Sequence, residues 1–260
     1  TPLLDALSAQ ALRLSFEFEP LSLANTAWAY SKLGKEDHPL MDALSSSARR
    51  LLSQLSTQHV SNTAWAFATL GVSDEPLLQS LAAEALRKII ETCPQHLSMM
   101  AWSFATLCVM DRPFFSAISA ASIATIFSFK PPEITNLAWS FSSLSVDDAT
   151  LFEALSEAFI KKCSDCGPRE LAITALSFAR IGYEDPPLMA AISAAAIRPI
   201  REFGQQELAN PAWAFAKLPF ADAPLLKAIS AAAIPRLPAF APQHLTNLAW
   251  SLAKVFPVQA

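Results

Sequence analysis

The sequence predicts an all-α fold, an α-solenoid of stacked helix-turn-helix repeats. Three observations predict it: a fixed 37-residue period, a helical spacing of apolar residues within each period, and prolines that recur at the joints between helices. Glycine is also scarce, with 5 residues in 260. This scarcity disfavours folds that depend on glycine turns or on glycine-rich phosphate loops.

Tryptophan marks the period. Successive tryptophans lie 37 residues apart, except for one gap of 74 residues whose midpoint is Leu176. With tryptophan as position 8, the repeats are 21–57, 58–94, 95–131, 132–168, 169–205 and 206–242, with half repeats 1–20 and 243–260. We expect a single helical-repeat domain, about six units long, that is a fragment of a longer array, because terminal repeats normally carry polar caps.

The first helix of each repeat is amphipathic. Position 7 is alanine in all seven copies, and position 10 is aromatic in six. At 100° per residue, positions 3, 7, 8, 10, 11 and 14 share one face. We therefore expect the tryptophans in the core between repeats, and we expect Leu176 to loosen its own repeat. Positions 2, 5, 9 and 12 fall on the opposite, polar face.

The second helix has a local start signal. Position 17 is aspartate in all six copies that reach it, and proline follows two positions later in five of them. Aspartate is a preferred N-cap, and proline in the first turn has no hydrogen bond to lose. Another proline recurs at position 37, directly before the next first helix, in five copies.

Enzymatic chemistry is not indicated. We find no phosphate-binding glycine motif, no nucleophile elbow and no acid–base constellation, so we expect no catalytic activity, no small-molecule substrate and no cofactor. Cys163 and Cys166 form a lone CxxC, whereas zinc usually takes four ligands, so no metal site is expected. The longest charge-free apolar run, 17 residues between Arg112 and Lys130, predicts a buried helix and no transmembrane segment. No signal or transit segment is recognisable.

The first-helix sequences resemble a known repeat family. QHVSNTAWAFATLG (58–71), QELANPAWAFAKLP (206–219) and PEITNLAWSFSSLS (132–145) are similar to octotricopeptide and heptatricopeptide repeats, helical hairpins of organellar proteins in algae and related protists. The resemblance covers the whole chain, and the 37-residue length is that of the heptatricopeptide variant. It implies RNA binding in a mitochondrion or plastid, in transcript processing or within an organellar ribosome.

Candidate binding residues lie on the polar face of the first helix. Position 9 is always alanine or serine, which is expected to leave room for a partner. The near-constant asparagine at position 5 favours a structural hydrogen-bonded ladder over base reading, while histidine at position 2 suits a polar helix start or a base contact. The candidates are Lys32, Arg180, Lys217 and Lys254 at position 12, Asn25, Asn62, Asn136, Asn210 and Asn247 at position 5, and His59, His96 and His244 at position 2.

A second row of cations occupies position 30 of the second helix, namely Arg13, Arg50, Arg87, Lys161 and Arg198. Stacked repeats would align them into a ladder suited to phosphates. Four of them have an acidic residue four positions later. This spacing favours a solvated salt-bridge face instead.

Two functions stay open. One is an RNA-binding module, alone or within an organellar ribonucleoprotein such as a ribosome. The alternative is a protein–protein scaffold subunit of a large organellar assembly, ribosomal or membrane-bound, without RNA contact. The net charge of −4 and the low charged content of 16% are not typical of a strong nucleic-acid binder, and the mean hydropathy of +0.30 favours extensive protein contacts.

Overall fold

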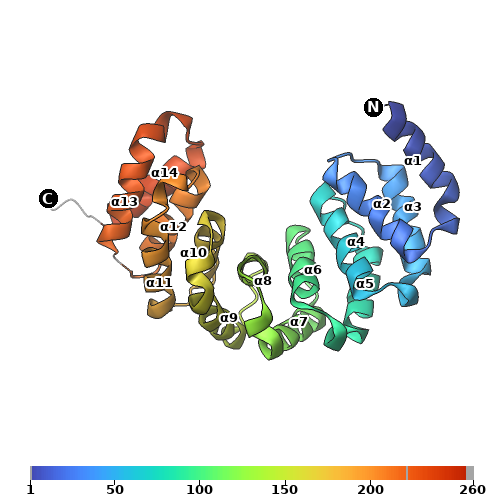
Figure 1. Ribbon diagram of the computed structural model, residues 1–260, viewed down its shortest axis with the longest axis horizontal. Helices are drawn as coiled ribbons and strands as arrows, with labels where there is room; N and C mark the ends of the chain where they lie inside the picture. The colour runs from blue at the N-terminus through green and yellow to red at the C-terminus, as the bar shows by residue number, and fades with distance from the viewer. Residues whose placement is uncertain (1, 221, 256–260) are drawn as a thin grey trace. The chain divides into compact units, whose positions relative to one another are not determined.

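The computed structural model describes residues 2–220 and 222–255, which form fourteen α-helices and, within those ranges, no β-strand. The chain divides into two compact units, Thr1–Thr125 and Ile126–Ala260. Each unit is a two-layer stack of helical hairpins (Figure 1). The α-solenoid prediction is confirmed in both. Thr1 and residues 256–260, the end of the last half repeat, lie outside the described residues.

The first unit holds three first helices in one layer: α2 (Pro20–Lys32), α4 (Thr57–Leu70) and α6 (Pro94–Thr106). The other layer consists of the second helices α1 (Pro2–Leu14), α3 (His38–Arg50), α5 (Glu75–Arg87) and α7 (Arg112–Thr125). Each helix contacts the next one in its own layer, and each first helix contacts the second helix that follows it.

The second unit repeats this arrangement. Its first helices are α8 (Pro131–Ser143), α10 (Pro168–Ile181), α12 (Gln205–Lys217) and α14 (Pro242–Val255). Its second helices are α9 (Ala149–Lys162), α11 (Pro186–Ile197) and α13 (Ala223–Ala233). In both units, neighbouring first helices make the most extensive contacts. Short 3₁₀ turns follow the second helices, for example η2 (Leu52–Gln54) and η3 (Ile89–Glu91).

The predicted helix starts are confirmed. At the starts of the six second helices that follow α1, the position-17 aspartate accepts a hydrogen bond from the backbone N–H three residues later, at 2.9–3.2 Å. The position-37 prolines are the first residues of α2, α6, α8, α10 and α14. Both signals act within one turn of the chain, so the local sequence is sufficient to set them.

The core is built on positions 3, 7 and 10 of the first helices. The aromatic residues at position 10, Tyr30, Phe67, Phe104, Phe141, Phe178 and Phe215, are 0–5% exposed. The expectation that the tryptophans also lie in the core was wrong. Trp28 and Trp250 are 44% and 43% exposed, and Trp65, Trp102, Trp139 and Trp213 are half-buried.

The reason is that each inner first helix is covered on three sides. Second helices cover one side, and the two neighbouring first helices cover the flanks. Only positions 1, 5, 8 and 12 remain uncovered by other helices. At 100° per residue, their side chains lie within about 60° of one another around the helix axis. Tryptophan at position 8 falls in this narrow arc and not in the core. Leu176, which replaces it once, is half-buried there as well, so it has no core packing to loosen.

Position 9 also differs from expectation. Its small side chains are buried between neighbouring first helices in six of the seven copies: Ala66, Ser103, Ser140, Ser177, Ala214 and Ser251. They therefore leave no room for an external partner. Their small size instead permits the close approach of the helices. The serines satisfy their hydroxyls by donating to the carbonyl oxygen four residues earlier, as Ser140 Oγ does to Asn136 at 2.6 Å.

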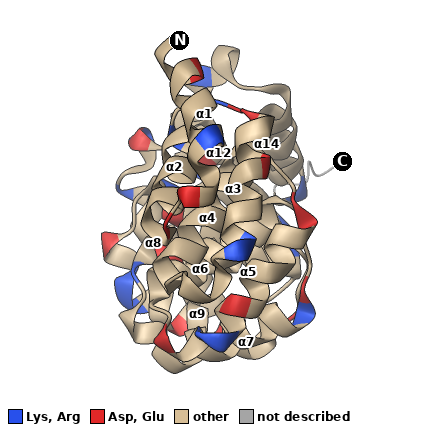
Figure 2. Cartoon of the chain, turned by 90° about the vertical axis from the view of Figure 1, so that its right-hand side faces the viewer, with Lys and Arg blue, Asp and Glu red and all other residues tan. Residues whose placement is uncertain are grey.

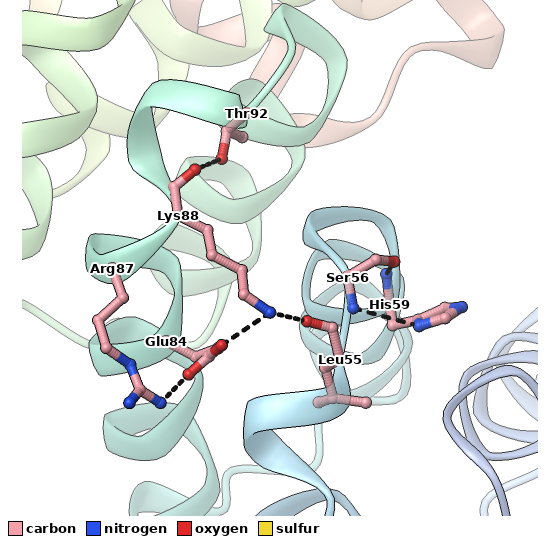
Figure 3. A network of polar contacts seen from close by, with 7 residues as sticks. All are labelled: Leu55, Ser56, His59, Glu84, Arg87, Lys88 and Thr92. Carbon is pink, nitrogen blue, oxygen red and sulfur yellow. Dashed lines mark hydrogen bonds and ion pairs between the residues drawn. The ribbon is translucent and has the colours of Figure 1, made fainter.

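Cations of the second helices join successive repeats. Lys88 Nζ donates to the carbonyl oxygen of Leu55 in the preceding repeat, beside the buried carboxylate of Glu84 (Figure 3). Lys162 donates to Phe129 at 2.6 Å, and Arg236 to Phe203 at 2.6 Å, in the same way. These bonds satisfy carbonyl groups that end the 3₁₀ turns.

The expected salt bridges at position 30 take other partners. Arg87 pairs with Glu84, three residues earlier, and Lys161 with Glu157, four residues earlier at 2.7 Å. Arg50 donates to the carbonyl oxygen of Phe16 at 2.9 Å. In the described part of the chain, no ion pair joins a position-30 cation to the acid four residues later. Because Arg50, Arg87 and Lys161 have partners within the protein, the position-30 cations do not form a continuous row that is free to bind phosphates.

Because position 10 lies in the core and position 8 lies at the surface, replacing these two aromatic residues of α12 by alanine should lower the free energy of unfolding by different amounts. Phe215→Ala removes a ring that is 1% exposed and should lower the free energy of unfolding by about 3–5 kcal/mol. Trp213→Ala removes a half-buried ring and should cost about 1–2 kcal/mol. Urea unfolding followed by circular dichroism measures both. Equal costs would show that position 8 belongs to the core after all.

The Glu84 network predicts a pH dependence. Burial raises the pKa of the Glu84 carboxyl, but hydrogen bonds from Lys88 and Arg87 outweigh it, so the pKa lies below its ordinary value of 4.5. A lowered pKa stabilises the fold above that value, and the contribution is lost as the pH falls through the folded-state pKa. Glu84→Gln should therefore cost about 1–2 kcal/mol at pH 7 and less at pH 3.5. The control is Glu91→Gln, which alters an exposed acid. It should leave the free energy of unfolding unchanged at both pH values.

Candidate nucleic-acid interface

The surface left open on the first helices consists of positions 1, 5, 8 and 12, and we call it the exposed strip. A typical copy is Gln58, Asn62, Trp65 and Thr69 on α4, and another is Gln243, Asn247, Trp250 and Lys254 on α14. The strip therefore combines amides, indoles and cations. Since neighbouring first helices lie side by side in each unit, the strips of successive repeats adjoin one another.

In the first unit the strip carries adjacent aromatic and cationic groups. The ring centroids of Trp65 and Trp102 are 6.5 Å apart, with an interplanar angle of 30°. Lys32 Nζ lies 5.6 Å from the ring centroid of Trp28 and 4.7 Å from that of Trp65. The ammonium group thus lies over indoles of two successive repeats, within the range of cation–π attraction.

The second unit shows the same pattern. The ring centroids of Trp213 and Trp250 are 6.4 Å apart at 34°. Lys217 Nζ lies 5.0 Å from the Trp213 ring and Lys254 Nζ 4.9 Å from the Trp250 ring. Both lysines follow their tryptophan by four residues, which places them on the same face of the helix.

Arg180 continues the row of cations in the second unit. Its Nη1 donates to Ser143 Oγ at 3.3 Å, and its carbonyl oxygen accepts from Lys217 Nζ at 3.4 Å. The structure therefore brings three of the four predicted cations, Arg180, Lys217 and Lys254, onto one face of the second unit. The fourth, Lys32, lies on the strip of the first unit. Among the described residues, no ion pair neutralises any of the four.

The asparagines of position 5 line the same strip. Asn25 is exposed, Asn62, Asn136 and Asn247 are half-buried, and Asn210 is buried. Within the described ranges, no hydrogen bond joins one of these asparagines to another, so the expected ladder is not formed. Asn25 is thus the most accessible of the five, and Asn210 the least.

The position-2 histidines act at helix starts. His59 Nδ1 accepts from the Ser56 backbone N–H at 3.3 Å, and His96 Nδ1 lies 3.1 Å from Thr57 Oγ1. Glu133 and Glu170 accept from the backbone at the same position in their own repeats. Burial, aided by the Lys88 ammonium, lowers the pKa of His59, and burial lowers the pKa of His96. Neither imidazole therefore adds positive charge to the strip at neutral pH.

Sequence reasoning missed the tryptophans as surface residues. The signal was present, because positions 1, 5, 8 and 12 form one arc and a lysine follows three of the tryptophans by four residues. Half-buried and exposed indoles with adjacent cations offer faces for stacking unpaired bases and charges for their phosphates. Elsewhere, basic and acidic residues are interspersed along largely uncharged helices (Figure 2).

Other chemistry has little support in the geometry. No group of three or more His, Cys, Asp or Glu side chains within residues 2–220 and 222–255 is arranged to hold a metal ion. In the same ranges, no helix has both the length and the hydrophobicity needed to cross a bilayer. Cys163 is buried, and Cys166 is half-buried.

Comparison with known proteins gives one finding. A family model described as RNA-editing substrate-binding complex 6 protein matches residues 1–219. That match covers most of the chain, including every repeat up to the end of α12. No curated protein matches the sequence.

The buried thiols yield a test of the CxxC segment. Burial raises the pKa of Cys163 to about 11 and, together with nearby negative charges, that of Cys166 to about 12. At pH 8 only about one thiol in a thousand or fewer would be the reactive thiolate. Iodoacetamide should therefore modify the exposed Cys93 and Cys108 first, as measured by peptide mass spectrometry. Rapid labelling of Cys163 or Cys166 in the folded protein would contradict the buried placement.

Proposed function

The chain belongs to the RNA-editing substrate-binding complex 6 protein family, and from this we propose that it is a non-catalytic module that binds single-stranded RNA within such a complex. The observation that carries the proposal is the exposed strip, where indoles of successive repeats lie side by side, tilted against one another, and lysine ammonium groups lie over their rings. Base stacking on aromatic side chains contributes about 1–3 kcal/mol per base and tolerates any sequence.

The low overall charge is compatible with this function. Stacking supplies affinity without a high density of phosphate contacts. A chain of net charge −4 can therefore bind single strands through a few local cations, Lys32 on the first unit and Arg180, Lys217 and Lys254 on the second. Six of its acidic groups are N-cap aspartates that accept backbone hydrogen bonds. Their charge is directed at helix N-termini, where it interacts favourably with the helix dipole.

A protein-scaffold role is the second candidate, and a specific surface favours it. Phe16 and Ile90, which lie in the 3₁₀ turns η1 (Ser15–Glu17) and η3 of the first unit, are 81% and 91% exposed. Exposed apolar side chains of this size suit contacts with other subunits. These residues lie outside the exposed strip, so both roles fit one molecule.

We also propose the compartment and the repeat type. The repeat resemblance implies an organelle, and between the mitochondrion and the plastid we propose the mitochondrion, as the match to an RNA-editing complex family supports. The 37-residue hairpins support the octotricopeptide and heptatricopeptide class as the repeat type. An organellar ribosome is the less favoured setting.

Charge reversal tests the RNA interface. Lys32, Arg180, Lys217 and Lys254, all changed to Glu, should abolish binding of a short single-stranded RNA measured by fluorescence anisotropy. Four phosphate contacts predict a slope of log affinity against log salt of about −3 for the unaltered chain.

A matched control separates the interface from net charge. Arg13, Arg49, Arg198 and Lys227 are exposed on or directly after second helices, and reversing them changes the net charge by the same amount. This variant should keep most of the affinity. Equal losses in both variants, or no binding by the unaltered chain at low salt, would favour the scaffold role.

A further inference from the structure

Three first helices of the second unit, α10, α12 and α14, enclose a hollow of about 350 Å³ on the exposed strip. Its walls include Leu176 and Arg180 of α10, Asn210 and Trp213 of α12, and His244 and Asn247 of α14. The hollow lies at the one repeat whose position 8 is leucine. A leucine side chain is much smaller than an indole, so this repeat leaves space beside Trp213 that a tryptophan would fill.

Two polar atoms at this hollow have no hydrogen-bond partner among residues 2–220 and 222–255. They are Asn210 Nδ2 and His244 Nδ1, which are both buried, and the whole Asn210 residue is only 6% exposed. Buried donors and acceptors are nearly always paired in folded proteins, because an unpaired one loses its bonds to water without replacement. Two unpaired nitrogens at the wall of one hollow therefore indicate a ligand that completes them.

We propose that this hollow binds one unpaired nucleobase of a single-stranded RNA, an inference that rests on the proposed RNA binding. Trp213 supplies a face for stacking, and Asn210 Nδ2 donates to an acceptor on the edge of the base. His244 Nδ1 completes a second hydrogen bond, as donor or acceptor according to its tautomer. The exposed Arg180 guanidinium at the rim meets the phosphate.

The proposal assigns this repeat a different task from its neighbours. Where tryptophan occupies position 8, the strip offers ring faces that accept any base. At the hollow, polar groups converge on a base edge, and hydrogen bonds to a base edge distinguish one base from another. The second unit thus combines sequence-tolerant stacking with one site of base selection.

Filling the hollow gives the sharper test. Leu176→Trp restores the residue found in the other repeats and adds an aromatic ring to the strip. If RNA binds only along the strip, this variant should bind short RNA homopolymers as tightly as the unaltered chain, or more tightly. If a base also enters the hollow, the variant should bind about tenfold more weakly, because the added indole would occupy the space of the base. Leu237→Trp, an equal change at an exposed leucine outside the strip, should leave the affinity unchanged.

Removing the donor tests base selection. Asn210→Leu should weaken binding about tenfold for the preferred homopolymer of U, C or A, and it should reduce the differences among the three. It should not lower the melting temperature, because the amide nitrogen that it removes makes no hydrogen bond in the protein. A lowered melting temperature with unchanged homopolymer preference would show a structural role and overturn the pocket.

The failures of the two proposals are distinguishable. If Leu176→Trp binds as tightly as the unaltered chain while reversal of the four strip cations abolishes binding, the strip binds RNA but the hollow holds no base. If the unaltered chain binds no homopolymer at low salt, both the proposed RNA interface and the proposed base pocket are wrong. About tenfold weaker binding by both Leu176→Trp and Asn210→Leu, with Leu237→Trp unchanged, supports the pocket.

Discussion

The close approach of neighbouring first helices is the constraint on which the rest of the structure depends. Alanine at position 7 is fully buried in every copy from Ala27 to Ala212, and the alanine or serine at position 9 is buried in most copies. Small side chains at these positions let helix backbones pack tightly. Each inner first helix is consequently covered on three sides, and its large side chains at positions 8 and 12 have only one narrow arc in which to lie. The exposed strip is thus a product of core packing.

The strip also explains how an acidic chain can present a cationic surface. Lys217 and Lys254 lie over indoles of their own helices, and Lys32 also reaches the indole of the next repeat. Some cations at the ends of the second helices, by contrast, bond within the protein, as Lys162 does to the Phe129 carbonyl. The net charge of the chain does not distinguish cations that join repeats from cations that remain on the surface.

The fold and the helix boundaries could be predicted from sequence because their signals are local. Asp185, for example, caps the helix that begins one residue later. The surface could not be predicted as well, because it depends on what covers each helix. Hydrophobicity placed Trp213 with Phe215 in the core. Phe215 lies on the side of α12 that the second helices cover, whereas Trp213 lies on the opposite, uncovered side. The partners of Lys88 and Arg236 were missed for the same reason, since each bonds a carbonyl 33 residues away.

Leu176 illustrates what a single departure from the repeat does in such an architecture. In a core position, replacing tryptophan by leucine would leave a cavity and loosen the packing. On the strip the same change leaves the core of α10 intact, since Leu171, Ala175 and Phe178 remain fully buried. It alters only the surface, where it leaves a hollow beside buried amide and imidazole nitrogens of the next two repeats. Because core and strip occupy separate positions of the helix, one repeat can change its binding surface without a corresponding loss of stability.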